Sequence, residues 1–221
     1  MLIGIVGFAG CGKGTMGESL VRNHGYVADS FAAPLKDATA SIFGWDRAML
    51  EGDTKESRFW RERPDRFWSQ EFGDHGFSPR KAMQVLGTDA CRHVLGESIW
   101  VASLVKRWQD AGQPDTVVTD VRFMNEVEAI KALDGKIVRI KRGSDPKWYQ
   151  TVLFANKGFA DEEEMDQIKQ LRVLDNIPHE SETAWIGCHI DLNIVNEAEI
   201  HDLETAIADY VGGLTQFTLN V

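Results

Sequence analysis

The residues best suited to chemistry lie in one short stretch, Gly7–Thr15. It reads Gly-Phe-Ala-Gly-Cys-Gly-Lys-Gly-Thr, and Gly7, Gly12 and Lys13 fit the G-x-x-x-x-G-K pattern of a Walker A loop. Glycines let the backbone curl until successive N–H groups point at phosphate oxygens, and Lys13 adds a cation for the β- and γ-phosphates. A plain glycine-rich turn is the alternative. The pattern predicts an ATP-binding loop made of Gly10, Cys11, Gly12, Lys13, Gly14 and Thr15.

One residue of this loop departs from the pattern. Gly14 stands where Ser or Thr is usual, and Thr15 follows it. The resulting Gly-Lys-Gly-Thr ending resembles nucleoside monophosphate kinases such as adenylate kinase. The departure leaves open whether a loop hydroxyl binds Mg²⁺ directly. We therefore expect Mg²⁺ to accompany ATP and to be held through water near Thr15 and Asp120.

The elements that must position the loop follow from hydrophobic periodicity and from helix start and stop signals. Strands are predicted at 2–6, 26–31, 116–119, 136–141 and 190–195. Helices are predicted at 13–24, 34–43, 98–111, 127–133 and 198–211, with another beginning at Ser78-Pro79. Strands that alternate with helices imply right-handed βαβ units. The expected fold class is α/β, a three-layer sandwich of P-loop NTPase type with a mostly parallel central sheet and helices on both faces.

Two stretches interrupt this alternation. Residues 45–77 are rich in Arg, Asp and Glu and are interpreted as an insertion with local helix. Residues 143–178 are interpreted as a second, irregular insertion that is too long for an ordinary connection. Within it, the acidic run Asp161–Glu164 is expected to be a solvated helix start rather than a metal site. The whole chain, residues 1–221, is predicted to be one domain.

Composition excludes several classes of protein. Hydrophobic residues at 43% and charged residues at 26% are typical of a globular chain, not of a collagen, a coiled coil or a disordered protein. A net charge of −10 argues against bulk nucleic-acid binding, which needs a basic surface. The three cysteines are far apart and form no disulfide framework, so a cytoplasmic location is expected. No stretch is long enough for a membrane span, and residues 1–10 are interpreted as a buried strand rather than a leader.

Phosphoryl transfer to a second phosphate needs positive charge on both sides of the transferring group. Lys36 follows Ala-Pro-Leu near the start of a predicted helix, and Arg80 opens the helix that follows Ser78. Asp120 and Arg122 follow a predicted strand at its carboxyl end, where ligands bind in open α/β sheets. A solvated lysine and a surface ion pair are the plain alternatives for Lys36 and Arg80.

A set of motifs occurs in a fixed order along the chain: Ala33-Pro34-Leu35-Lys36, the stretch Arg80–Asp89, Ile99-Trp100-Val101, Asp120-x-Arg122 and His179-x-Ser181-Glu182. The set resembles the bacteriophage-type deoxynucleoside monophosphate kinases of the P-loop nucleoside monophosphate kinase superfamily. The resemblance covers residues 1–43 and 78–142, whereas 44–77 and 143–178 differ from what that family leads us to expect. It implies ATP-dependent phosphorylation of a deoxynucleoside monophosphate to the diphosphate, with Mg²⁺, in the host cytoplasm if the source is a phage.

The resemblance also implies roles for single residues. Those it assigns to the monophosphate are Lys36, Arg80, Gly87, Thr88, Trp100, Asp120, Arg122 and Glu126. In this assignment 45–77 is an insertion on the acceptor side. Each role has a plain alternative: Trp100 as a core anchor, and Gly87-Thr88 as a helix stop followed by an N-cap. His179 and Glu182 are either part of the site or residues that cap a helix.

Catalysis of this kind depends on alignment and charge neutralisation, because the acceptor phosphate is already ionised and needs no strong base. The predicted catalytic residues are Lys13, Arg122, Asp120 and Arg142. We expect residues 143–178, here called the lid, to close over ATP and exclude water. Arg142 is preferred to Arg172 as the arginine that closes with it. A solvent-exposed decoration is the alternative for the lid.

Two other functions stay open at this point. One is another small-molecule kinase, resembling dephospho-coenzyme A kinase. The other is a regulatory module that binds nucleotide without transferring phosphate, although the presence of Lys13, Arg80 and Arg122 argues against it. The sequence does not decide which bases are accepted, how deoxyribose is told from ribose, or the oligomeric state, for which a homodimer is one option.

Overall fold

The computed structural model describes residues 1–173, 177–197, 205–206, 208–210 and 212–213. They belong to two compact units. We call residues 1–30 and 108–221 the sheet unit, and residues 31–107 the helical unit. Each is described by itself, and the single domain expected from the sequence stays a prediction.

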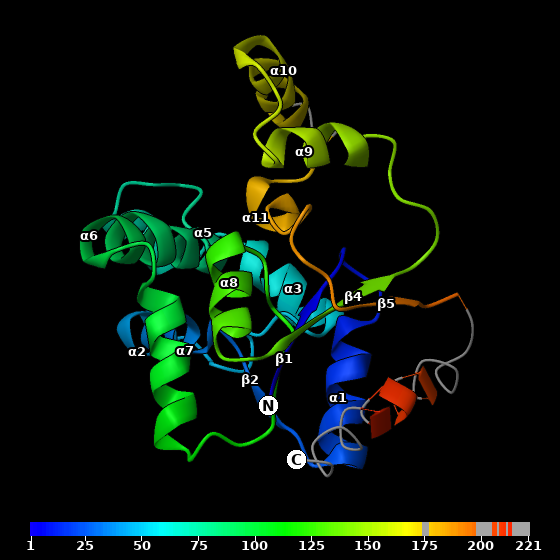
Figure 1. Ribbon diagram of the computed structural model, residues 1–221. Coiled ribbons are helices and arrows are strands. Elements are labelled where there is room, and N and C mark those ends of the chain that lie inside the picture. The colour runs from blue at the N-terminus through cyan, green and yellow to red at the C-terminus, as the bar shows by residue number, and fades with distance from the viewer. Residues whose placement is uncertain (174–176, 198–204, 207, 211, 214–221) are drawn as a thin grey trace. The chain divides into compact units, whose positions relative to one another are not determined.

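The sheet unit is built on a five-stranded parallel sheet (Figure 1). Its strands are β1 (Leu2–Val6), β2 (Val27–Asp29), β3 (Thr116–Val118), β4 (Lys136–Lys141) and β5 (Leu192–Val195). They lie in the order β2-β3-β1-β4-β5, and every adjacent pair is parallel. β1 lies in the middle and all its residues are buried, as is typical of a strand covered on both faces. The predicted parallel sheet is confirmed.

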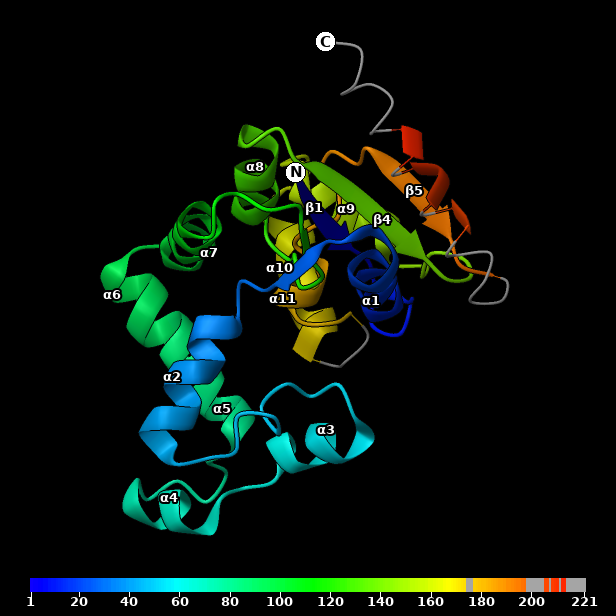
Figure 2. The same cartoon turned by 90° about the horizontal axis from the view of Figure 1, so that it is seen from below.

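Helices cover both faces of this sheet (Figure 2). Ile5 of β1 shares a core cluster with Met16 of α1 (Lys13–His24). On the other side, a Cβ built on Gly4 would come within 2.6 Å of Ile130, which belongs to α8 (Met124–Ala132). Because consecutive residues of a strand point to opposite faces, α1 and α8 lie on opposite sides of the sheet. The predicted three-layer arrangement is therefore confirmed.

The lid contains regular structure where the sequence predicts an irregular insertion. It holds α9 (Tyr149–Asn156) and α10 (Glu162–Val173), which contact each other, and α11 (Glu180–Thr183) follows it (Figure 1). The acidic run explains the start of α10, because Asp161 accepts the Glu164 N–H at 2.9 Å and Glu164 accepts the Asp161 N–H at 3.0 Å. The run is a helix start, as expected.

The helical unit consists of short helices around aromatic side chains. They are α2 (Ala33–Phe43), α3 (Lys55–Glu62), α4 (Arg66–Glu71), α5 (Pro79–Gln84), the π-helix η1 (Val85–Arg92), α6 (His93–Leu95) and most of α7 (Ile99–Asp110). The ring of Trp45 stacks on Phe43 at 4.6 Å, and its Nε1 donates to Asp65 at 2.9 Å. Trp68 meets Phe43 edge-on at 5.1 Å. The local helix predicted within 45–77 is thus confirmed as α3 and α4, and these aromatic contacts fix it.

Two further expectations concern the chain as a whole. Within the described residues, no helix combines the length and apolar character needed to cross a membrane. The helix predicted at 198–211 falls mostly outside the described residues.

Candidate functional site

The phosphate-binding loop between β1 and α1 has a shape that only glycine permits at two positions. Gly7 has a φ of 145°, and a Cβ there would lie 2.3 Å from the carbonyl oxygen of Ile140 in β4. Gly12 has a φ of 112° and stands immediately before α1. The Cys11 N–H donates to the Phe8 carbonyl at 3.3 Å and closes the turn. The start of α1 therefore faces the loop with unpaired N–H groups, the arrangement that binds phosphate.

Lys13 lies folded onto its own loop. Its Nζ donates to the carbonyl oxygens of Gly7 at 2.7 Å and of Phe8 at 3.0 Å. Burial lowers the pKa of Lys13, while the nearby Cys11 and Glu182 raise it and Arg122 lowers it. Carbonyl groups of the loop itself therefore position the ammonium group.

A residue that the sequence analysis did not single out fixes the same loop from the end of the edge strand β5. Asn196 follows β5, its Nδ2 donates to the Cys11 carbonyl at 2.8 Å, and its N–H donates to the Lys141 carbonyl at 2.7 Å. Nothing in the sequence marks a lone asparagine after a last strand. The contact is visible only once β4 and β5 are paired.

Asp120 lies at the same edge of the sheet as the loop, because all five strands are parallel and end there. Its Oδ2 accepts the hydroxyl of Ser30, which follows β2, at 2.7 Å. Thr15 lies half-buried in the first turn of α1. Carboxylate and hydroxyl oxygens suit Mg²⁺. In the described residues no cluster of three or more His, Cys, Asp or Glu side chains is arranged to hold a metal. The Mg²⁺ expected near Thr15 and Asp120 stays a prediction.

Arg122 follows Asp120 and is half-exposed, with its Nη1 paired to the carboxylate of Glu182 in α11. Glu126 has a different environment, because its side chain is buried. Its Oε2 accepts the N–H of Arg122 at 2.7 Å and of Phe123 at 3.1 Å. Glu126 therefore shapes the backbone that carries Arg122. The contact with the transferred phosphate that the resemblance implies for Glu126 stays a prediction.

Arg142 is exposed and follows β4 directly, at the edge where the loop lies. The start of the lid is attached to the loop by aromatic contacts that sequence analysis missed. The ring of Phe8 meets Trp148 at 5.4 Å and Trp185 at 5.3 Å. The guanidinium of Arg139 lies over the ring of Trp185 at 5.3 Å. The sequence signal that could have indicated these contacts was an aromatic residue inside the loop together with tryptophans far along the chain.

The helical unit holds the two predicted acceptor cations in ion pairs. Lys36 Nζ pairs with Glu51, whose other oxygen bonds Arg47. Arg80 Nη1 lies 3.3 Å from Glu62 Oε1. Both partners come from 45–77, so the insertion supplies the negative charge that these cations face.

Gly87 does not end a helix, contrary to the plain alternative. The helix that begins at Ser78 continues through Gly87 as the π-helix η1 to Arg92. Gly87 packs tightly, since a Cβ there would lie 2.8 Å from Leu35, and its carbonyl accepts Trp100 Nε1 at 3.1 Å. Thr88 is exposed on η1. Widened π-helical turns are frequent at functional sites. The roles of these residues near the base stay predictions.

His179 behaves as the capping alternative predicts, whereas the side chain of Glu182 pairs with Arg122. The Nδ1 of His179 accepts the N–H of Ser181 at 3.2 Å and lies 3.0 Å from its hydroxyl. His179 thus begins α11, the helix that carries Glu182.

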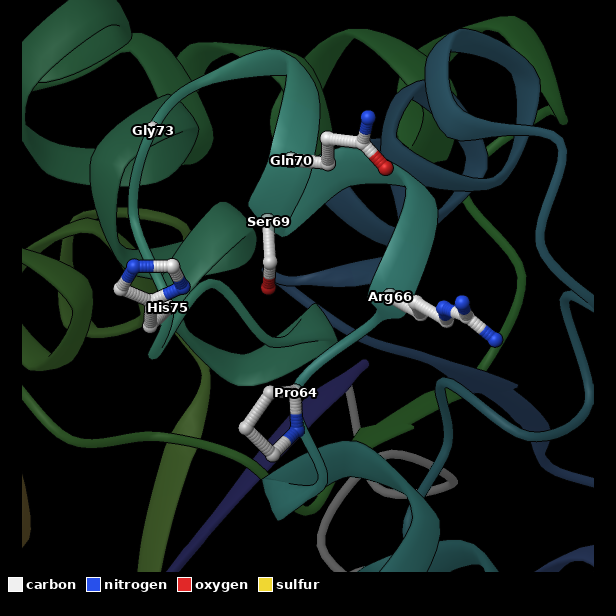
Figure 3. Close-up of a pocket in the computed structure, with 6 residues that line it drawn as sticks. All are labelled: Pro64, Arg66, Ser69, Gln70, Gly73 and His75. Atoms are coloured by element: carbon white, nitrogen blue, oxygen red, sulfur yellow. The ribbon is translucent and has the colours of Figure 1, made fainter.

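A shallow hollow of about 520 Å³ lies on the helical unit (Figure 3). It is lined by Pro64, Arg66, Ser69, Gln70, Gly73 and His75. These residues come from α4 and its flanking loops, and none belongs to the predicted site. The hollow lies within 45–77 and is assigned no ligand.

Comparison with known proteins adds to this geometry. The family model described as deoxynucleotide monophosphate kinase matches residues 53–152. A curated protein of Acanthamoeba polyphaga mimivirus, provisionally named a deoxynucleotide monophosphate kinase, is 31% identical over 156 residues, which are 64% of this chain and 74% of that protein.

Solved structures are more distant. A dephospho-CoA kinase from Campylobacter jejuni is 16% identical with a TM-score of 0.43, over 96% of each chain. A shikimate kinase from Aquifex aeolicus is 13% identical with a TM-score of 0.42, over 98% of this chain and 99% of the other. Likenesses this weak carry no argument. The mimivirus relative does, because its identity extends over about three quarters of its length, and on that basis the chain belongs to the deoxynucleotide monophosphate kinase family.

Proposed function

We propose that this protein transfers the γ-phosphoryl group of ATP to a deoxynucleoside monophosphate, giving ADP and the diphosphate. The observation that carries the proposal is the placement of Lys13, Asp120 and Arg122 at one edge of a parallel sheet, beside a glycine loop shaped for phosphate. Membership of the family supports the choice of acceptor.

The donor side works through charge and orientation. N–H groups of the loop and of the α1 N-terminus bind the phosphates of ATP, and Lys13 and Arg122 share the negative charge of the transferring group. Asp120 and Thr15 would hold Mg²⁺ through water, and the ion would supply positive charge that stabilises the phosphates. The acceptor phosphate attacks as an anion, so no residue has to remove a proton.

The acceptor side uses a second set of cations. Lys36 and Arg80 bind the phosphate of the monophosphate, which takes the place of the carboxylates of Glu51 and Glu62. Gly87, Thr88 and Trp100 lie near the base, and Glu126 orders the backbone of Arg122. Arg142 closes with the lid. A homodimer stays an open option.

The decisive experiment measures ADP release from ATP with each common ribo- and deoxynucleoside monophosphate in turn. A kinase of this family shows release that depends strongly on a deoxynucleoside monophosphate. Release that is equal with and without acceptor would contradict the proposal and favour a nucleotide-binding module. Activity confined to another class of acceptor would instead place the protein among other small-molecule kinases.

A further inference from the structure

The last motif of the chain, His179-x-Ser181-Glu182, has no role in the proposed reaction. Its glutamate nevertheless meets the donor site, because the carboxylate of Glu182 pairs with Arg122 Nη1 across 60 positions of sequence. Lys13 is likewise bound to acceptors of the protein itself, the carbonyls of Gly7 and Phe8. Both donor-side cations thus have partners within the protein itself.

Hydrogen bonds and a ring contact fix the position of Glu182. Asn156 Nδ2 donates to the carbonyls of Thr183 at 3.0 Å and Ile186 at 2.9 Å, which ties the end of α11 to α9. Trp185 donates from Nε1 to the Glu182 carbonyl at 3.0 Å, and its ring packs on Phe8 of the loop. These contacts hold the backbone of Glu182 against the phosphate-binding loop.

The negative charge of Glu182 attracts Lys13 and Arg122 but repels a bound phosphate. Its negative charge offsets the repulsion between Lys13 and Arg122, and it acts on both, since it pairs with Arg122 and raises the pKa of Lys13. Beside a triphosphate the same carboxylate is a like charge. Arg122 cannot give its full hydrogen-bonding capacity to a phosphate while it is bound to Glu182.

We propose that Glu182 sets the affinity for ATP: it occupies Arg122 as a phosphate oxygen would, and it must release Arg122 before the triphosphate binds tightly. Glu182 acts through Arg122 and is therefore a positioning residue. The inference rests on the proposed function only in taking Arg122 as a ligand of the ATP phosphates.

The test measures the dissociation constant for ATP by calorimetry, in the absence of any acceptor. Glu182→Gln should bind ATP about fivefold more tightly than the wild type, because a half-exposed ion pair that competes with the ligand is gone. Loss of a merely structural contact would weaken binding, so the direction of the change separates the two roles. Glu182→Asp, which keeps the charge, should return the dissociation constant toward that of the wild type.

A matched control lies on the same helix. Glu180→Gln removes an equal charge from α11, but Glu180 faces Arg172 at 3.9 Å rather than Arg122. It should leave ATP affinity unchanged. A second control compares Arg122→Ala with Arg122→Ala/Glu182→Gln. The gain from Glu182→Gln should be clearly smaller in this background, which also tests the inference if the single variant folds poorly.

The results that would contradict this inference differ from those that would contradict the proposed function. Unchanged or weaker ATP binding by folded Glu182→Gln overturns the inference, as does an equal gain in Glu180→Gln or in the Arg122→Ala background. If the wild type binds ATP but phosphorylates no deoxynucleoside monophosphate, the proposed function fails while the inference stands on its binding data. A wild type that binds no ATP overturns both.

Discussion

The cations of the two units are held in different ways. In the sheet unit, Lys13 is bound by backbone carbonyls five and six residues away, within its own loop. In the helical unit, Lys36 and Arg80 are bound by the side chains of Glu51 and Glu62, which lie in separate segments. The first arrangement is local and follows from a motif. The second depends on how 45–77 folds around its aromatic residues.

This difference indicates where variation in function is tolerated. A change within Gly7–Thr15 disturbs a loop in which Gly7 has no room for a side chain. A change in 45–77 alters the charges that Lys36 and Arg80, the cations proposed to bind the acceptor, face. The insertion is therefore the region in which we expect acceptor preference to be adjusted, with ATP binding left intact.

The largest effect should come from Lys13→Ala. Removing the ammonium takes a cation from the transferring phosphates, and turnover should fall at least about 100-fold. The aliphatic stem contributes little to the core, so the thermal unfolding midpoint should stay close to that of the wild type. Steady-state kinetics and circular dichroism check both statements. Lys55→Ala, at an exposed lysine of α3, is the control. Near-normal turnover in Lys13→Ala would contradict the phosphate-loop assignment.

Next in size are Arg80→Ala and Lys36→Ala. Each should raise the KM for the monophosphate far more than the KM for ATP, since a lost charge-assisted bond costs about 1.5–3 kcal/mol, which corresponds to about 10- to 150-fold. Varying the two substrates separately gives the two KM values. Arg66→Ala removes an exposed arginine beside the hollow of Figure 3 and should change neither. Equal effects on both substrates would show that these cations do not define an acceptor side.

A smaller effect is expected from Arg142→Ala. If this arginine closes with the lid, kcat should fall about tenfold, equivalent to about 1.4 kcal/mol of transition-state stabilisation, with little change in the ATP dissociation constant. In the wild type, a bisubstrate nucleotide analogue should slow amide hydrogen exchange across the lid. A normal kcat together with unchanged exchange would show that the lid is a solvent-exposed segment that does not close over ATP. It would also show that Arg142 is not the closing arginine.

The smallest effect concerns pH. Burial lowers the pKa of Lys13 from its ordinary 10.5, so the ammonium loses its charge at a lower pH than a solvated lysine does. The contribution of the Lys13 ammonium to ATP affinity should therefore be fully present below that lowered pKa. It should be lost as the pH rises through the pKa. Glu182 raises the same pKa, so Glu182→Gln should shift the fall to still lower pH. Dissociation constants measured across the alkaline range test this, with Lys13→Arg as a control, because arginine stays charged throughout. An identical fall in Lys13→Arg would assign it to another group.

Sequence reasoning succeeded where the determinants are local. The loop, the strands of the sheet and the helix starts at Ser78 and Asp161 follow from short patterns of glycine, periodicity and capping. The contacts of Asn196, Phe8 and Glu182 could not be predicted, because each joins segments that meet only after the sheet and α11 have formed. The helix α9 was missed for a related reason: its hydrophobic periodicity is weak, and its start packs on the loop rather than on the main core.

The bond from Asn196 to the Cys11 carbonyl joins residues 185 positions apart. Contacts of such high sequence separation form late, because the long intervening chain must first be ordered. During synthesis the loop residue Cys11 emerges 185 positions before the asparagine that fixes it. A growing chain thus carries the phosphate-binding sequence long before it carries the finished phosphate-binding shape.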